Sequence, residues 1–596
     1  MAELFAQGRQ NLPLSQAGRI QDLLRLVPGA RVEPSAKDLL AAMQDRGRVA
    51  LVPAPASLQA SFRPYQREGY SWLVFLHKSK TGGVLADDMG LGKTLQTLGL
   101  LAYLRDEALG LAPVSEGAEA AEAAAPKKVA RKAKKADDAP EAEAAPKKPA
   151  RKTKKADDST AREASTAVQA DAAAKKPRSL VVAPTSVLSN WLKEIEKFAP
   201  SLRAVLWAGP DREKRTHEVD SADVVVTSYA LLRRDEEFLQ QYEFTYVILD
   251  EAQNIKNPLS ATARAAKKIR AQHRLCLSGT PIENRLSEIW SIFDFLSPGL
   301  LGDLATFEER YARPIDRGDA EAVRRLREVI RPLVLRRTKR EVAKDLPERI
   351  VMERDCELPA SQKALYQQVL TQVRQSLMGE IERVGINKSQ IQILAGLTRL
   401  RQAACDPRLL KLPNASFGDD DSGKLQVLRE TLAEATAGGH RTLVFSQFTE
   451  MLALIRRVLD AEKVKYEYLD GSTRDRQERV ERFNSDESVS VFLISLKAGG
   501  AGLNLTGADT VIHFDPWWNP AVEDQATDRA HRIGQTRVVT AYRLIARGTI
   551  EEKIMALSAK KRELVSSVLG GDEGSVPKGL SKTDVELLLA DDEATA

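Results

Sequence analysis

One stretch of the sequence has residue types suited to binding phosphate. Residues 87–94 read DDMGLGKT, after a short apolar run at 84–86 and before a helical pattern at 95–101. A strand, a glycine-containing turn and a helix are the context in which such a loop binds phosphate. The glycines let backbone N–H groups approach phosphate oxygens, and the helix N-terminus adds positive potential. Lys93 would then reach the β- and γ-phosphates of a nucleotide, and Thr94 would ligate Mg²⁺.

The loop departs from the strict phosphate-loop pattern at one position. That pattern has a glycine five positions before Gly92, where this chain has Asp87. Taken alone, the loop could be a glycine-rich turn that caps a helix and binds no ligand.

A pair of carboxylates follows another apolar run. Residues 246–253 read YVILDEAQ, and a strand that ends in Asp250 and Glu251 places both acids at the carboxyl edge of a sheet. Asp250 could hold Mg²⁺, and Glu251 could orient and deprotonate an attacking water. A helix N-cap would explain Asp250 alone, but not a phosphate-binding loop in the same half of the chain. Together the two motifs favour a nucleoside-triphosphate hydrolase.

Alternating strand and helix signals surround these motifs. Short apolar, β-branched runs are separated by helix-length segments, which predicts an α/β protein with two parallel-sheet lobes. In the first half the runs lie at 84–86, 180–183, 224–227, 247–249 and 275–277; in the second half they lie at 442–445, 466–469, 489–494, 511–514 and 538–544. Between the lobes the strand signals vanish, and charged amphipathic patterns predict helices.

A repeated basic segment interrupts the first lobe. The sequence at 126–138 recurs almost unchanged at 146–158. Residues 126–159 hold 12 Lys/Arg and 6 Asp/Glu, so their surplus equals the net charge of +6 of the whole chain. The remainder is balanced, and a nucleic-acid surface there must be local. With few bulky apolar residues, residues 108–177 are predicted to be a disordered insertion, either a phosphate-binding arm or a solvated spacer.

The composition excludes several classes of protein. Three cysteines without a CxxC pair argue against a zinc site and a disulfide framework. Neither a signal pattern nor a long uncharged apolar run is present, so a soluble intracellular protein is expected. The expected parts are an N-terminal helical or irregular extension at 1–57, a first lobe at 58–300, a helical protrusion and linker at 301–420, a second lobe at 421–575 and an acidic tail at 576–596.

Several motifs occur in the order typical of SWI/SNF-type ATPases, which are helicase-like members of superfamily two. DEAQ at 250–253 is similar to the DEAD/DEAH box, with Gln253 in place of the commoner histidine, and LSGTPIEN at 277–284 resembles the coupling motif. DDMGLGKT is this family's own form of the phosphate loop, so Asp87 supports the resemblance. RPYQ at 63–66 resembles the adenine-contacting Q motif, and APTSVLSNW at 183–191 resembles the first DNA-contacting motif.

The second half continues the same order of motifs. They are VFSQF at 444–448, LDGST at 469–473, KAGGAGLNL at 497–505, DPWWNP at 515–520 and QATDRAHRIGQ at 525–535. The match extends from about residue 62 to residue 556. It implies two RecA-like lobes with helical protrusions between them, and a site for ATP and Mg²⁺ that forms when the lobes close.

The resemblance assigns roles residue by residue. The nucleotide would be held by Arg63, Gln66, Asp88, Met89, Gly90, Leu91, Gly92, Lys93, Thr94 and Gln525. Catalysis would use Glu251, Asp250, Lys93, Arg529 and Arg532, with Thr94 and Asp250 as the Mg²⁺ ligands. Arg529 and Arg532, expected on one helical face at i and i+3, resemble the arginine fingers. Ser278 and Thr280, in the coupling motif, would couple ATP hydrolysis to movement on DNA.

Small and hydroxyl-bearing residues are the candidates for DNA contact. They are Thr185, Ser186, Trp191, Ser228, Tyr229, Gln447, Ser495, Lys497, Gly499 and Gly500. Such residues suit phosphate and sugar contacts more than base reading, so little sequence specificity is expected.

The function expected from all this is ATP-driven translocation on double-stranded DNA that remodels or displaces a DNA-bound protein. The alternatives are a strand-separating DNA or RNA helicase, and a nucleic-acid-binding scaffold with a silent ATPase. A monomer on DNA without membrane contact is expected. A bacterial source is favoured, in which the protein would be cytoplasmic or nucleoid-associated; in a eukaryote it would be nuclear. The short N-terminal region suggests a fragment of a longer architecture.

Overall fold

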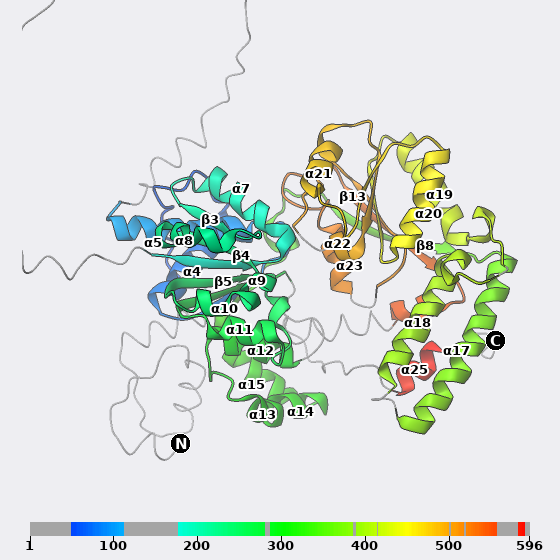
Figure 1. Ribbon diagram of the computed structural model, residues 1–596, viewed down its shortest axis with the longest axis horizontal. Coiled ribbons are helices and arrows are strands. Elements are labelled where there is room, and N and C mark those ends of the chain that lie inside the picture. The colour runs from blue at the N-terminus through cyan, green and yellow to red at the C-terminus, as the bar shows by residue number, and fades with distance from the viewer. Residues whose placement is uncertain are drawn as a thin grey trace, which may run out of the picture.

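Two parallel β-sheets, each flanked by helices, form the two halves of the chain in the computed structural model (Figure 1). The structure describes residues 49–112, 177–279, 286–385, 389–413, 415–499, 502–517, 520–556 and 582–590. Most of the predicted N-terminal extension and basic insertion, together with Thr280 and Gly500, therefore lie outside the described residues. The α/β prediction with two parallel-sheet lobes is confirmed.

The first lobe is a seven-stranded sheet in the order β3-β4-β2-β5-β6-β1-β7, and every pairing is parallel. Its strands are β1 (Gly83–Leu85), β2 (Ser179–Ala183), β3 (Ala204–Trp207), β4 (Val224–Ser228), β5 (Phe244–Asp250), β6 (Ala271–Leu277) and β7 (Val334–Leu335). Leu85, Leu277 and Asp250 are in register with one another across β1, β6 and β5. The residues that follow these strands therefore meet at one carboxyl edge, where the site forms.

Helices cover both faces of this sheet because its strands are apolar on both sides. One apolar core lies under α4 (Pro64–Lys78), α5 (Lys93–Leu109) and α7 (Leu188–Phe198). The opposite core lies under α8 (Thr216–Ser221), α9 (Tyr229–Arg234), α10 (Glu236–Leu239), α11 (Ala261–Lys268), α12 (Leu286–Leu296), α13 (Leu304–Phe307), α14 (Arg313–Asp316) and α15 (Ala320–Ile330).

The second lobe is a six-stranded parallel sheet in the order β10-β11-β9-β12-β13-β8. Its strands are β8 (Arg349–Cys356), β9 (Thr442–Ser446), β10 (Tyr466–Leu469), β11 (Val491–Ser495), β12 (Thr510–His513) and β13 (Val539–Ala546). One face packs on α19 (Gly423–Ala437) and α20 (Thr449–Ala461), the other on α21 (Arg476–Ser485), α22 (Leu496–Gly499) and α23 (Pro520–Thr527).

The sequence predicts that the segment between the lobes is helical, and this prediction is wrong in part because the segment also contains two strands. Within 301–420, β7 adds to the edge of the first sheet and β8 to the edge of the second, with α16 (Lys339–Val342) between them. The remaining helices, α17 (Ala360–Val384) and α18 (Gln390–Cys405), form a pair beside the second lobe (Figure 1).

The predicted acidic tail also contains structure. Residues 582–588 form α25 (Lys582–Leu588), whose Val585 and Leu588 are buried in the core shared by α17 and α18. Within the described part of the chain, no helix combines the length and the apolar character that crossing a membrane requires.

Candidate active site

The predicted phosphate loop connects β1 to the first residue of α5. Gly90 and Gly92 both have the left-handed backbone conformation, at φ +84° and +81°, which glycine adopts without steric cost. The Lys93 ammonium donates to the backbone carbonyls of Asp87 at 2.5 Å and of Asp88 at 3.3 Å. The lysine is therefore folded over its own loop, at the N-terminus of a helix where anions bind.

Asp87 has a structural partner that explains why the loop departs from the strict pattern. Its carboxylate is fully buried and accepts from Arg337 Nε at 3.0 Å and Nη2 at 2.5 Å. Arg337 follows the edge strand β7, and it also donates to the side chain of Gln96 in α5. The aspartate thus joins the loop, the first helix and the strand that ends the first lobe.

Asp87→Gly would give the loop its strict phosphate-binding pattern, yet we expect it to destabilise the protein. The free energy of unfolding should fall by about 3–5 kcal/mol, because Arg337 stays buried without its carboxylate. Urea unfolding followed by tryptophan fluorescence measures the change. The double variant Asp87→Gly/Arg337→Met should recover part of the loss, and a loss below about 1 kcal/mol for Asp87→Gly would contradict a buried ion pair.

The Q motif lies against the same loop. The side-chain amide of Gln66 donates to the Leu91 carbonyl at 3.1 Å and accepts from the Arg63 backbone at 3.0 Å. Arg63 itself pairs with Asp345 at 2.6 Å. Asp88 accepts from the backbone N–H of Lys339 at 2.9 Å. The remaining predicted nucleotide residues, Met89, Leu91 and Gln525, are buried.

Asp250 ends β5 beside the phosphate loop. Its Oδ2 accepts from the indole N–H of Trp191 at 2.8 Å, and its Oδ1 accepts from the Glu251 backbone at 3.0 Å. Burial, with the neighbouring Glu251 carboxylate adding to it, raises the pKa of Asp250 to about 7. A cation at this position would favour the ionised form.

Glu251 is held in an unusual backbone conformation. Its φ is +51°, a left-handed conformation that costs free energy in a residue other than glycine and occurs at functional sites. Its carboxylate accepts from Gln253 Nε2 at 2.8 Å, and Gln253 Oε1 accepts from Ser278 Oγ at 3.0 Å. A chain of hydrogen bonds therefore joins the DEAQ box to Ser278, the first residue of the predicted coupling pair. It passes through Gln253, to which the sequence assigned no role beyond replacing the commoner histidine.

The two arginines of the second lobe lie at this site, but not on a helix. α23 ends at Thr527, and Arg529 and Arg532 lie in the turns that follow it. The carbonyls of Arg529 and Ala530 accept from the Leu505 N–H and the Gln535 amide, so these carbonyls serve partners outside a helix. The predicted helical face at i and i+3 is therefore wrong.

Arg529 is buried beside Glu251. Burial lowers the pKa of Arg529 to about 10, and the Glu251 charge opposes that shift. Its Nε and Nη2 atoms are buried and have no hydrogen-bond partner, although buried donors are almost always paired. Arg532 packs on the phosphate loop, since a Cβ placed on Gly90 would lie 2.6 Å from the Cβ of Arg532.

These groups fit a nucleotide with its metal ion. Phosphate oxygens are the acceptors that the unpaired N–H groups of Arg529 lack. Thr94 and Asp250 are the predicted Mg²⁺ ligands; Thr94 donates to Glu194 of α7. No cluster of three or more His, Cys, Asp or Glu side chains suited to a metal occurs in the described ranges. Two protein ligands suit Mg²⁺, which usually keeps waters and phosphate oxygens.

Four of the predicted DNA contacts are buried, which contradicts an exposed DNA-binding role for their side chains. Trp191 is fully buried and binds Asp250. Ser228 caps α9, and the Tyr229 hydroxyl donates to the Asp250 carbonyl at 2.8 Å. Ser495 is 3% exposed. Burial leaves these four side chains almost no exposed surface: Trp191 lies within α7 and Tyr229 begins α9, while Ser228 and Ser495 end β4 and β11.

The other predicted DNA contacts differ in exposure. Thr185 is exposed, and Ser186 and Gln447 are half-buried. Gln447 accepts from Arg401 Nη1 at 2.9 Å, so α18 reaches this loop. Lys497 and Gly499 lie in α22.

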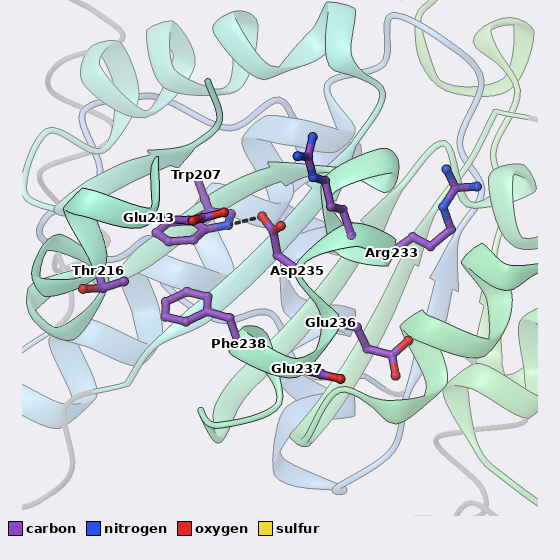
Figure 2. A pocket seen from close by; sticks show the side chains of 9 residues that line it. Trp207, Glu213, Thr216, Arg233, Asp235, Glu236, Glu237 and Phe238 are labelled. Atoms are coloured by element: carbon purple, nitrogen blue, oxygen red, sulfur yellow. Dashed lines mark hydrogen bonds between the residues drawn. The ribbon is translucent and has the colours of Figure 1, made fainter. Parts of the chain in front are cut away.

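A cavity of about 430 Å³ lies elsewhere on the first lobe, around the ends of β3 and α9 (Figure 2). Trp207 donates to Asp235 at 2.8 Å and stacks on Phe238 with ring centroids 4.4 Å apart. The lining residues are Trp207, Glu213, Thr216, Arg233, Arg234, Asp235, Glu236, Glu237 and Phe238. No residue of the predicted nucleotide site is among them.

Comparison with known families agrees with this geometry. The SNF2-related domain matches residues 65–409, which is more than half of the chain. The chain belongs to the SNF2-related family. The helicase conserved C-terminal domain matches residues 423–534 of this SNF2-related protein.

Curated relatives extend the comparison. YwqA of Bacillus subtilis is 37% identical over an alignment of 523 residues, which covers 86% of this SNF2-related chain and 49% of YwqA. The TATA-binding protein-associated factor MOT1 of Saccharomyces cerevisiae is 34% identical over 612 residues, covering 93% of this chain and 30% of MOT1. The chain thus spans about half or less of these relatives. The SWI2/SNF2 ATPase core of Sulfolobus solfataricus in complex with dsDNA is 34% identical, with 90% of this chain and 99% of that one covered and a TM-score of 0.40.

Proposed function

We propose that this SNF2-related chain is an ATP-dependent translocase on double-stranded DNA that remodels or displaces a DNA-bound protein. One observation carries the proposal. The buried guanidinium of Arg529, from the second lobe, faces Glu251 of the first lobe and has N–H groups without an acceptor. A site built from both lobes couples nucleotide turnover to their relative movement, as a translocase requires.

The site residues divide the chemistry between them. Bound ATP would supply a transferable γ-phosphoryl group, and Mg²⁺ would neutralise its charge. Lys93, Arg529 and Arg532 bind phosphate oxygens and stabilise the charge that develops during transfer. Glu251, held by Gln253, accepts the proton of the attacking water. Thr94 and Asp250 would hold the metal ion.

The remaining site residues position these groups. Gln66 and Arg63 would lie beside the adenine base. The other residues that would line the nucleotide are Asp88, Met89, Gly90, Leu91, Gly92 and Gln525. The Gln253–Ser278 hydrogen bond, at 3.0 Å, links the DEAQ box to the coupling motif, in which Thr280 is the second proposed coupling residue. Arg529 closes the site from the second lobe.

The proposed DNA surface uses residues at the ends of strands. Thr185 and Ser186 on the first lobe, and Gln447, Lys497, Gly499 and Gly500 on the second, would contact phosphates and sugars. Such contacts give little sequence specificity. The similarity to MOT1, a factor named for its association with the TATA-binding protein, supports a DNA-bound protein as the target. We propose that the chain acts as a monomer.

ATP hydrolysis measured with four additions tests the proposal: no polymer, duplex DNA, single-stranded DNA and RNA. We expect duplex DNA to stimulate turnover most, because the proposed translocation requires the two lobes to bind and release a DNA duplex in turn. Equal turnover under all four conditions would overturn the translocase. Stimulation by RNA alone would instead indicate a strand-separating helicase, and the absence of turnover in every case would indicate a silent scaffold.

A further inference from the structure

Lys339 contacts both halves of the candidate site, although no motif assigns it a role. It begins α16, in the segment that passes from the first sheet to the second. Its backbone N–H donates to Asp88 Oδ2 at 2.9 Å, and its Cε lies 3.8 Å from a Cβ placed on Gly90. Its ammonium pairs with Asp528 Oδ1 at 2.7 Å and donates to the carbonyl of His531.

The two contacts with the second lobe are with the residues that precede the arginines. Asp528 immediately precedes Arg529, and His531 immediately precedes Arg532. Because this segment leaves the helix at Thr527, its conformation depends on partners outside it. Lys339 thus contacts the first and the fourth of the five residues, 528–532, that carry the two guanidiniums.

The Lys339–Asp528 pair is shielded from water. The side chain of Lys339 is 8% exposed and that of Asp528 is 13% exposed. Removing one partner of such a pair leaves the other charge buried, which is far costlier than breaking a surface pair. Two further contacts from the same connection reach residues 528–532: Arg349 Nη1 lies 3.7 Å from Asp528 Oδ1, and the Pro347 carbonyl faces His531 Nε2 at 2.8 Å.

We propose that Lys339 is a positioning residue, which holds the segment 528–532 of the second lobe on the phosphate loop and so places Arg529 and Arg532 for catalysis. The inference rests on the proposed function for its activity readout. In this proposal Lys339 touches neither the reacting atoms nor DNA, and its effect on turnover passes through Arg529 and Arg532.

Lys339→Met tests this in the full chain with saturating duplex DNA. We expect kcat to fall about 10- to 100-fold, since small displacements of catalytic groups have such effects, while the KM for ATP changes less than about threefold. Lys339→Arg, which keeps the charge, should restore much of the rate. The neighbouring Arg340 is exposed on the same short helix, and Arg340→Ala should leave kcat unchanged.

A second readout does not depend on turnover. The native cysteines Cys276, Cys356 and Cys405 are buried, so dyes can be attached at Glu196→Cys on the first lobe and Arg457→Cys on the second, both exposed positions. With duplex DNA and a non-hydrolysable ATP analogue, Lys339→Met should show a smaller closed population by energy transfer than wild type or Arg340→Ala.

A partner variant keeps the proposal testable if Lys339→Met fails to fold. Asp528→Asn should lower kcat similarly, and the double variant should lower it no further than either single change. Multiplying effects, or unchanged energy transfer with unchanged kcat, would overturn the proposal. If wild type hydrolyses no ATP with any polymer, the proposed function fails, whereas the energy-transfer comparison still decides the role of Lys339.

Discussion

Glu251→Gln is expected to lower ATP turnover at least about 10²-fold, and up to about 10⁴-fold, the range typical for loss of a general base. Binding of ATP and of DNA should stay close to wild type. The substitution replaces one carboxylate oxygen by an amide NH₂ group and leaves the shape of the side chain almost unchanged. It removes the proton acceptor and leaves the phosphate-binding cations in place.

The surroundings of Glu251 explain why the variant should keep its structure. The Gln253 amide donates to Glu251 Oε2 at 2.8 Å, and the carbonyl oxygen of a glutamine side chain can accept that bond equally well. The left-handed backbone at φ +51° is contacted by Tyr229, whose hydroxyl donates to the Asp250 carbonyl at 2.8 Å. Neither contact needs a carboxylate at 251.

Steady-state hydrolysis with duplex DNA, paired with ATP affinity from equilibrium dialysis, measures the split. Glu237→Gln is the matched control, because Glu237 is an exposed acid of the same lobe and its loss should leave turnover unchanged. Turnover of Glu251→Gln within about threefold of wild type would remove this residue as the catalytic base.

The strands that the sequence missed all lie at sheet edges, although the sequence does predict one edge strand, β10. Interior strands such as β2 and β5 are covered on both faces, and their continuous apolar runs are easily recognised. The missed strands are β3, β7 and β8. β8 shows the reason most clearly, since Ile350, Val351 and Met352 are each more than 40% exposed and its pattern lacks the signature of a buried strand.

The site contains residues that belong to short local motifs and residues whose partners are distant in the sequence. The loop around Lys93 and the pair Asp250–Glu251 could be read from adjacent residues, because each motif lies on one strand end. The partner of Asp87 is Arg337, 250 positions away, and that of Asp250 is Trp191, which the sequence placed on the DNA surface. Such pairings depend on strand order, which a motif does not encode.

Arg529→Met is the variant in which catalysis and stability should change in different directions. We expect turnover to fall about 10³-fold or more, the range for loss of an arginine finger. Stability should not fall, because methionine fills similar space and removes a buried charge whose Nε and Nη2 atoms have no partner. Replacing buried ionic groups by apolar ones of similar volume is often neutral or stabilising.

Thermal unfolding without nucleotide, together with ATP hydrolysis on duplex DNA, measures both effects. Arg457→Met is the control, because Arg457 is exposed on α20 of the same lobe and should change neither quantity. A midpoint several degrees below wild type would mean that the guanidinium stabilises the fold. Turnover within about tenfold of wild type would mean that the site works without it. The expected pair of results, lost turnover with an unchanged or higher midpoint, is what a charge kept unpaired for an incoming phosphate should give, because its free-energy benefit exists only in the loaded site.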